Sequence, residues 1–120
     1  MTCLKKKVFI SFLKSPVGST YYLEGTRIAL GILSGNEEHE VTIACLGNGV
    51  RCAIRGVDRS YASSLLDMFG QNESGKRFYV EKESLREEGI SESELDERFA
   101  VASREELSKK MIDADLTFSF

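Results

Sequence analysis

The sequence predicts a three-layer α/β/α sandwich built on a mostly parallel sheet of about five strands. Short apolar runs rich in β-branched and aromatic residues alternate along the chain with segments of helical period. The first such strand–helix–strand unit is complete by residue 46, and units of this kind are almost always right-handed crossovers between parallel strands. A chain of 120 residues has the length of one domain, so a single domain over residues 1–120 is expected.

The first half of the chain supplies two expected strands joined by a helix. Lys7–Leu13 is nearly continuous in apolar character, which is typical of a strand covered on both faces. A helix is expected from about Thr20, capped by Ser19 or Thr20 and ended by Gly35. Its predicted apolar face consists of Tyr22, Leu23, Thr26, Ala29, Leu30 and Leu33.

After a polar loop, Val41–Leu46 is the second predicted strand, and a tight glycine-rich connection leads into a short helix. The second half begins with a predicted helix over Ser60–Phe69 and a loop over Gly70–Gly75. The later predicted elements are a strand at Arg77–Val80, a helix at Ser84–Glu88 ended by Gly89, a polar link at Ser91–Glu97, a strand at Phe99–Val101, a helix from a capping box at Ser103–Glu106 to about Ile112, and a strand at Leu116–Phe120.

Composition and charge exclude several classes of protein. The net charge of −3 is opposite in sign to that of a general nucleic-acid binder, so no direct contact with nucleic acid is expected. The one basic run, Lys5-Lys6-Lys7, flanks a strand and is interpreted as a solubility feature. The apolar stretch after it is shorter than the ~20 residues that a membrane span needs. A cytoplasmic protein without membrane contact is therefore expected.

Neither a metal site nor a cofactor is indicated. The three cysteines, Cys3, Cys45 and Cys52, form no CxxC pair, and this spacing predicts neither a disulfide framework nor a zinc site. The single His39 stands among glutamates and cannot build a metal site alone.

Two glycine-containing loops follow the first two strands, and both could hold a small ligand at the carboxyl ends of the strands. Backbone amides at a helix N-terminus favour phosphate. The dinucleotide fingerprint needs a third glycine, however, and no G-x-x-x-x-G-K-[ST] motif occurs. We therefore favour the interpretation that the glycines permit tight turns. The candidate ligand residues of the two loops are Gly18, Ser19, Gly47, Asn48 and Gly49.

Cys52 is the one candidate catalytic thiol. It is expected in the first turn of a short helix, where the helix dipole and the nearby Arg51 and Arg55 would lower a thiol pKa. Free cysteine is also among the most buried residue types, so a core position is the favoured alternative.

A strand passes directly into a charged helix at residues 77–89, the place where an α/β fold collects its chemistry. The carboxylates there could form an acid/base pair. They alternate with Lys82 and Arg86, which favours a solvated helix face instead. The carboxylates are Glu81, Glu83, Glu87 and Glu88.

Four short stretches, in their order and spacing, resemble the DsrE/DsrF-like family of sulfur-relay proteins, and most of all its DsrF/TusC branch. The stretches are Ser15-Pro16-Val17-Gly18-Ser19, Leu46-Gly47-Asn48-Gly49-Val50, Val80 to Gly89, and Ala114-Asp115-Leu116-Thr117-Phe118. The resemblance covers about Lys7 to Phe120 and implies a domain of flavodoxin-like layering.

The resemblance also implies a cytoplasmic subunit of an oligomer that moves persulfide sulfur, for transfer-RNA thiolation or for sulfur oxidation. Its partners would be further copies, related DsrE-type subunits, or sulfur donor and acceptor proteins. The carrier subunits of the family hold a cysteine after the third strand, and counting back from Gly89 places that position at Glu81. A carboxylate cannot hold a persulfide, because the chemistry needs a thiolate.

Three functions therefore stay open. The first is a structural or partner-binding subunit without a carrier thiol. The second is a thiol-dependent sulfurtransferase that uses Cys52. The third is a small-ligand binder at the carboxyl ends of the strands.

Overall fold

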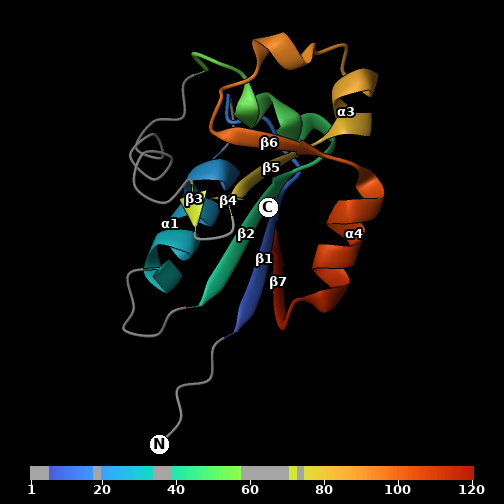
Figure 1. Ribbon diagram of the computed structural model, residues 1–120. Coiled ribbons are helices and arrows are strands. Elements are labelled where there is room, and N and C mark those ends of the chain that lie inside the picture. Colours follow the sequence, from blue (N-terminus) through green and yellow to red (C-terminus); the bar gives the residue numbers. More distant parts are fainter. Residues whose placement is uncertain (1–5, 18–19, 34–38, 58–70, 73–74) are drawn as a thin grey trace, which may run out of the picture.

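A computed structural model describes residues 6–17, 20–33, 39–57, 71–72 and 75–120 of the chain (Figure 1). Strands and helices alternate as expected. In order, the elements are β1 (Lys7–Phe12), α1 (Tyr21–Leu33), β2 (Glu40–Cys45), the 3₁₀ helix η1 (Gly47–Ala53), β3 (Gln71–Asn72), β4 (Gly75–Lys76), β5 (Phe78–Glu81), α3 (Lys82–Glu87), the 3₁₀ helix η3 (Glu92–Glu94), β6 (Phe99–Ala102), α4 (Arg104–Asp113) and β7 (Leu116–Ser119).

The main sheet has five strands in the order β6-β5-β2-β1-β7, and every neighbouring pair is parallel. β1 lies between β2 and β7, with Val8 opposite Val41 on one side and Leu116 on the other. Because all five strands run the same way, their carboxyl ends share one edge of the sheet. The predicted parallel sheet is confirmed.

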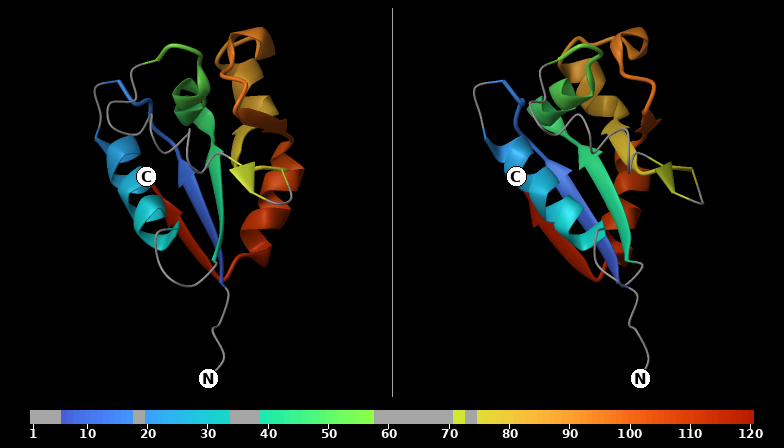
Figure 2. Two further views of the ribbon diagram at one scale, coloured as in Figure 1. Left: turned by 60° about the vertical axis from the view of Figure 1, so that its left-hand side comes forward. Right: turned by 90° about the vertical axis from the view of Figure 1, so that its left-hand side faces the viewer.

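Helices cover both faces of this sheet, with α1 on one side and α4 on the other (Figure 2). The larger apolar cluster lies on the α1 side and includes Ile10, Phe12 and Phe78. A smaller cluster on the α4 side contains Phe9 and Leu107. Alternate residues of β1 enter opposite clusters, as the two-residue period of a strand requires. The three-layer α/β/α arrangement is therefore confirmed. In the parts of the chain that the structure describes, no helix is both long and apolar enough to cross a membrane.

The buried face of α1 differs from the predicted one. Tyr22, Thr26 and Ala29 are buried as expected, but Leu30 is 43% exposed, and Gly25 is buried in its place. A Cβ atom on Gly25 would lie 2.6 Å from Cζ of Phe12. The helix therefore approaches β1 along its smallest residues, and this rotates Leu30 away from the sheet.

The loop predicted over Gly70–Gly75 is wrong in part. Gln71–Asn72 and Gly75–Lys76 pair as a small antiparallel ribbon, separate from the main sheet. Strands of two residues carry no hydrophobic alternation, so the sequence pattern could not indicate them. The helix predicted at Ser60–Phe69 and the helix end predicted at Gly35 lie outside the described residues.

Two helix ends match their predicted chemistry. At the start of α4, the Glu106 amide donates to Oγ of Ser103 at 3.1 Å. The Glu106 carboxylate accepts from the Ser103 hydroxyl at 3.3 Å, so the recorded contact of Glu106 is with the Ser103 side chain and the predicted capping box is matched only in its first hydrogen bond. Gly89 has φ of 69° just after α3, a conformation that suits glycine best, and it ends that helix as expected.

Candidate functional site

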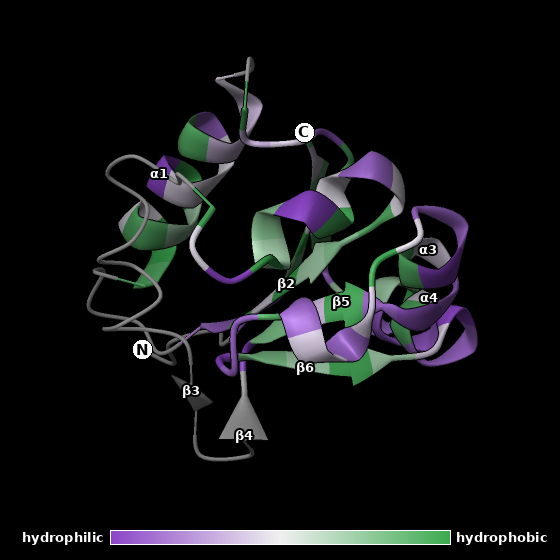
Figure 3. Ribbon diagram, turned by 90° about the horizontal axis from the view of Figure 1, so that it is seen from above, coloured by the Kyte–Doolittle hydropathy of each residue, from purple (hydrophilic) through white to green (hydrophobic). Residues whose placement is uncertain are grey.

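The candidate site lies where β5 passes into α3. Glu81 is the last residue of β5 and Lys82 is the first of α3, so no turn separates them. Seen from above, this junction lies beside α4, and hydrophilic residues of α3 and α4 gather next to the end of the sheet (Figure 3). The site thus occupies the edge where parallel α/β sheets hold their ligands and reactive groups.

Glu81 is the central side chain of this site, and it is only 6% exposed. Its Oε1 atom accepts a hydrogen bond from the Ser84 hydroxyl at 2.5 Å and another from Nη2 of Arg104 at 2.9 Å. The expected solvated helix face is therefore wrong for Glu81. The strand alternation turns this residue toward α4, where a buried carboxylate is stable only with partners.

Ser84 links Glu81 to the loop after β2. The Ser84 oxygen accepts a hydrogen bond from the Gly47 amide at 2.8 Å while its hydroxyl donates to Glu81. Gly47 has φ of 55°, which lets the chain turn sharply after β2 and bring this amide to α3. One hydrogen-bonded chain thus joins the carboxyl ends of β2 and β5.

Arg104, the first residue of α4, completes the network from the far side. Its Nη2 atom lies 2.9 Å from Glu81 and 3.3 Å from Glu87. Hydrogen bonds from the guanidinium to Glu81 and Glu87 raise the pKa of Arg104 further above its already high ordinary value. The side chain is about half exposed and stays cationic. Arg104 was not predicted as a site residue, and its only signal in the sequence is its place after the Ser103 cap.

Glu83 joins α3 to the N-terminus of α4. Its Oε1 atom accepts the backbone amide of Arg104 at 2.9 Å. This hydrogen bond lowers the pKa of Glu83 below its ordinary value near 4.5. A carboxylate at a helix N-terminus also interacts favourably with the helix dipole.

Glu83 should therefore add an acid-sensitive component to stability. Since its pKa is lowered on folding, its contribution is present above the unfolded pKa and is lost as the pH falls through the folded pKa. The Glu83→Gln variant should show a smaller loss of thermal stability than the parent between about pH 5 and pH 3. The matched control is Glu92→Gln, at an exposed glutamate of η3. Equal acid profiles for the parent and Glu83→Gln would contradict the assignment.

Cys52, the predicted candidate thiol, lies in η1 and is fully buried. Its Sγ atom is 3.4 Å from the carbonyl oxygen of Lys14, to which the thiol donates. Cys45 is buried at the end of β2, and Cys3 lies outside the described residues. Cys52 thus lies in η1, after β2, whereas Glu81 ends β5.

The glycine loop after β2 is used for packing. Gly49 has no room for a side chain, because a Cβ atom would lie 2.5 Å from the carbonyl carbon of Phe12 and closer still to its oxygen. The Gly47 amide is directed to Ser84, as described above. Asn48 accepts from Nε of Arg51 at 3.1 Å. The other candidate ligand residues, Gly18 and Ser19, lie outside the described residues.

Among the described residues, no group of three His, Cys, Asp or Glu side chains is placed to hold a metal ion. The Nδ1 atom of His39 accepts the Lys6 amide at 3.0 Å.

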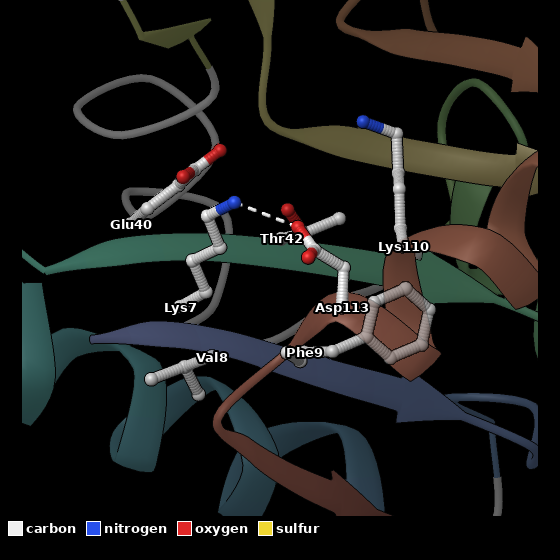
Figure 4. A pocket seen from close by; sticks show the side chains of 8 residues that line it. Lys7, Val8, Phe9, Glu40, Thr42, Lys110 and Asp113 are labelled. Atoms are coloured by element: carbon white, nitrogen blue, oxygen red, sulfur yellow. Dashed lines mark hydrogen bonds and ion pairs between the residues drawn. The ribbon is translucent and has the colours of Figure 1, made fainter.

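A small pocket of about 60 Å³ lies at the opposite end of the strands, between β1, β2 and the end of α4 (Figure 4). Lys7 and Asp113 form an ion pair of 2.6 Å across it. This pair raises the pKa of Lys7 and lowers that of Asp113. The pocket has room for a few water molecules and lies at the amino ends of the strands, away from the Glu81 site.

Solved structures share this fold. YchN from E. coli is similar with a TM-score of 0.77 at 17% sequence identity, and the match covers 98% of this chain and 100% of YchN. The protein of unknown function MTH1491 from Methanobacterium thermoautotrophicum is similar with a TM-score of 0.65 at 18% identity, again over 98% of this chain and 100% of the other. No curated protein sequence matches the chain.

The sequence itself matches the DsrE/DsrF-like family over residues 6–120, a range that includes every element of the sheet and the whole Glu81 site. Membership suggests a role related to sulfur relay. The three-layer fold, its parallel sheet and this match agree: the chain belongs to the DsrE/DsrF-like family.

Proposed function

We propose that this protein is a structural or partner-binding subunit of a cytoplasmic sulfur-relay system, related to the DsrF/TusC branch and without a carrier thiol of its own. The proposal rests on one observation, the presence of a glutamate at position 81. Position 81 ends β5, where the carrier subunits of the family would hold their cysteine, and here it is a carboxylate held by Ser84 and Arg104. The partners would be further copies of the chain, related DsrE-type subunits, or sulfur donors and acceptors.

The chemistry of transfer explains why this substitution matters. A carrier thiolate attacks the outer sulfur of a donor persulfide, the donor leaves as its thiolate, and the carrier becomes the persulfide. A glutamate offers no sulfur and cannot take part in this exchange. The hydrogen bonds to Glu81 instead tie together the loop after β2, α3 and α4, and so support a fixed surface at the carboxyl ends of the strands.

Cys52 is the alternative acceptor, and the structure offers it little access. A thiol must reach the donor sulfur to attack it, whereas Cys52 is fully buried beneath the chain that follows β1. Gly49 is packed against the Phe12 backbone and the Gly47 amide is bound to Ser84, so this loop gives no support to the small-ligand alternative. Neither alternative is favoured by an observation at the site.

The test compares the parent with Glu81→Cys after both are exposed to glutathione persulfide, with intact mass and peptide mapping as the readout. Glu81→Cys places a thiol beside the half-exposed Arg104 guanidinium, which should favour the thiolate and which leaves this thiol closer to solvent than the fully buried Cys52. We expect the variant to gain the mass of one sulfur atom at residue 81, and the parent to gain none at the buried Cys45 and Cys52. Peptide mapping scores Cys3 separately in both proteins. Circular dichroism of both proteins checks that the variant is folded.

Two outcomes of this test would contradict the proposal or the assignment of the carrier position. Persulfide on Cys52 of the parent, lost in Cys52→Ser, would replace the proposal with the sulfurtransferase alternative. A folded Glu81→Cys variant that takes up no sulfur would show that residue 81 is not a carrier position. Because the variant serves as a positive control, an unmodified parent cannot be attributed to an inactive donor.

A further inference from the structure

A larger pocket lies just before β6, at the end of that strand opposite to the Glu81 site. Residues 95–98 immediately precede β6, whereas Glu81 pairs with Ala102 at the last position of the strand. Pockets that bind small molecules usually measure about 300–1,000 Å³. This one has a volume of about 510 Å³, and its lining includes Arg55, Leu95, Asp96, Glu97 and Arg98. It is therefore large enough for a small organic ligand.

Backbone contacts fix the position of Arg55 at this pocket. Ile54 and Leu95 form an antiparallel bridge, and the Arg55 amide donates to the carbonyl of Glu94 at 2.8 Å. On the other side of the bridge, the amide of Asp96 donates to a carbonyl of η1, also at 2.8 Å. The chain after η1 is thus attached to the chain after η3, and these two segments form the walls of the pocket.

The guanidinium of Arg55 is held by uncharged groups. Its Nη2 atom donates to the carbonyl of Ser93 at 2.6 Å and to that of Leu95 at 3.4 Å. Among the residues that the structure describes, no carboxylate forms an ion pair with Arg55. An arginine has five N–H donors and stays protonated, so Nε and Nη1 keep their hydrogens for a ligand. Arg55 therefore brings a fixed positive charge to the pocket that no carboxylate of the described residues balances.

The second arginine of the pocket is already paired with a carboxylate. Nε and Nη2 of Arg98 donate to the two carboxylate oxygens of Asp96 at 2.9 and 2.7 Å, which is a bidentate pair. Asp96 is only 7% exposed, and a buried carboxylate is stable only with such partners. The backbone amide of Arg98 also donates to Asp96, at 3.0 Å. The charge of Arg98 thus balances that of Asp96.

The remaining charges favour a ligand with one negative charge. Arg98 and Asp96 cancel, which leaves Arg55 and the carboxylate of the exposed Glu97 along the pocket. A carboxylate at Arg55 gains charge-assisted hydrogen bonds, whereas a doubly charged phosphate would be repelled more strongly by Glu97. Because the Arg55 guanidinium is held before a ligand arrives, its binding costs little side-chain entropy.

We propose that this pocket binds a small organic acid through a single carboxylate, with Arg55 as the binding residue. The carboxylate accepts hydrogen bonds from Nε and Nη1 of Arg55, and the Arg98–Asp96 pair keeps the opposite wall in place. The body of the acid fills the space before β6. The proposal concerns the far end of β6 from Glu81 and does not depend on the relay function.

The test is a titration of the unmodified protein with 4-fluorobenzoate, followed by amide chemical shifts and by the fluorine signal of the probe. 4-Fluorobenzamide has nearly the same shape without the charge, and 4-fluorophenyl phosphate carries two charges above neutral pH. We expect saturable shifts at residues 55 and 94–98 with the benzoate. The amide and the phosphate should each bind about tenfold more weakly, because one lacks the charge-assisted bond and the other is repelled.

The deciding variant is Arg55→Gln, which should weaken benzoate binding by about tenfold. Arg51→Gln is the matched control, because Arg51 contacts Asn48 and Glu88 and should leave binding unchanged. Arg55→Lys keeps the charge and should bind the benzoate more tightly than Arg55→Gln. Circular dichroism checks that the variants are folded, and the titration of the unmodified protein decides the proposal even if one of them is not.

Three results would overturn the proposal. The first is the absence of saturable shifts at residues 55 and 94–98 of the unmodified protein at millimolar benzoate. The second is equal binding of the benzamide or the phosphate, which would remove the requirement for a single carboxylate. The third is a folded Arg55→Gln variant that binds like the parent. The persulfide assay at residue 81 is scored separately, so the two proposals fail independently.

Discussion

Replacing Gly49 by alanine is expected to destabilise the protein by roughly 3 kcal/mol or more, a cost at the upper end of those seen for overpacking. The added methyl would lie 2.5 Å from the carbonyl carbon of Phe12, and this obstacle is backbone. The Phe12 carbonyl also accepts the Leu46 amide at 2.9 Å, so its movement would disturb the connection between β1 and β2. Urea unfolding followed by circular dichroism measures the loss.

Gly31→Ala is the matched control. Gly31 lies within α1, and an added Cβ atom meets nothing within 4 Å. Alanine should stabilise the helix there by about 0.5–1 kcal/mol, because it loses less conformational entropy on folding. Equal stability of the parent and Gly49→Ala would show that the loop after β2 can move away from β1.

Glu81→Ala is expected to lower the free energy of unfolding by about 2 kcal/mol, the range for buried groups that lose a hydrogen-bond partner. The change leaves the buried Ser84 hydroxyl without its acceptor and removes the ion pair to Arg104. Arg104 is half exposed and can be solvated by water in the variant, so the loss of stability is smaller than for a fully buried ion pair. Thermal and urea unfolding of the parent and the variant measure the change in the free energy of unfolding.

The matched control here is Glu87→Ala, which removes the second carboxylate bound to Arg104. The Glu87 side chain is 64% exposed and its contact is longer, at 3.3 Å. An exposed pair of this kind contributes about 0–1 kcal/mol. If both variants lose the same stability, the buried network around Glu81 is not the source of the effect.

The sequence predicted the main sheet well because each of its strands carries its own signal. β1 and β2 are buried on both faces and read as continuous apolar runs, and the turn residues after them mark where they end. The β3–β4 ribbon lacks such a signal, since its pairing depends on neighbours and not on apolar pattern. The exposed Leu30 shows the same limit, because helical period alone did not reveal that α1 packs along Gly25.

The sequence indicated the position of the candidate site, but it did not indicate the burial of Glu81 or the hydrogen bonds that Glu81 makes. The passage from strand to helix and the identity of Glu81 were both visible in the order of residues. The burial of Glu81 depends on Arg104, 23 residues further along the chain, and on the loop after β2. Contacts over such separations arise only when the sheet assembles, and a local charge pattern therefore indicated a solvated face.

The pairing of β1 with β7 has a consequence for how the chain folds. Lys7 and Asp115, 108 residues apart, are joined by a hydrogen bond at the start of this pair of strands. During synthesis, at roughly 5–20 residues per second, β1 is made long before β7 and waits for most of the domain before its second neighbour exists. Until then one side of a largely apolar strand is open to other nascent chains. Protection of β1 by chaperones therefore matters most before residues 116–119 leave the ribosome.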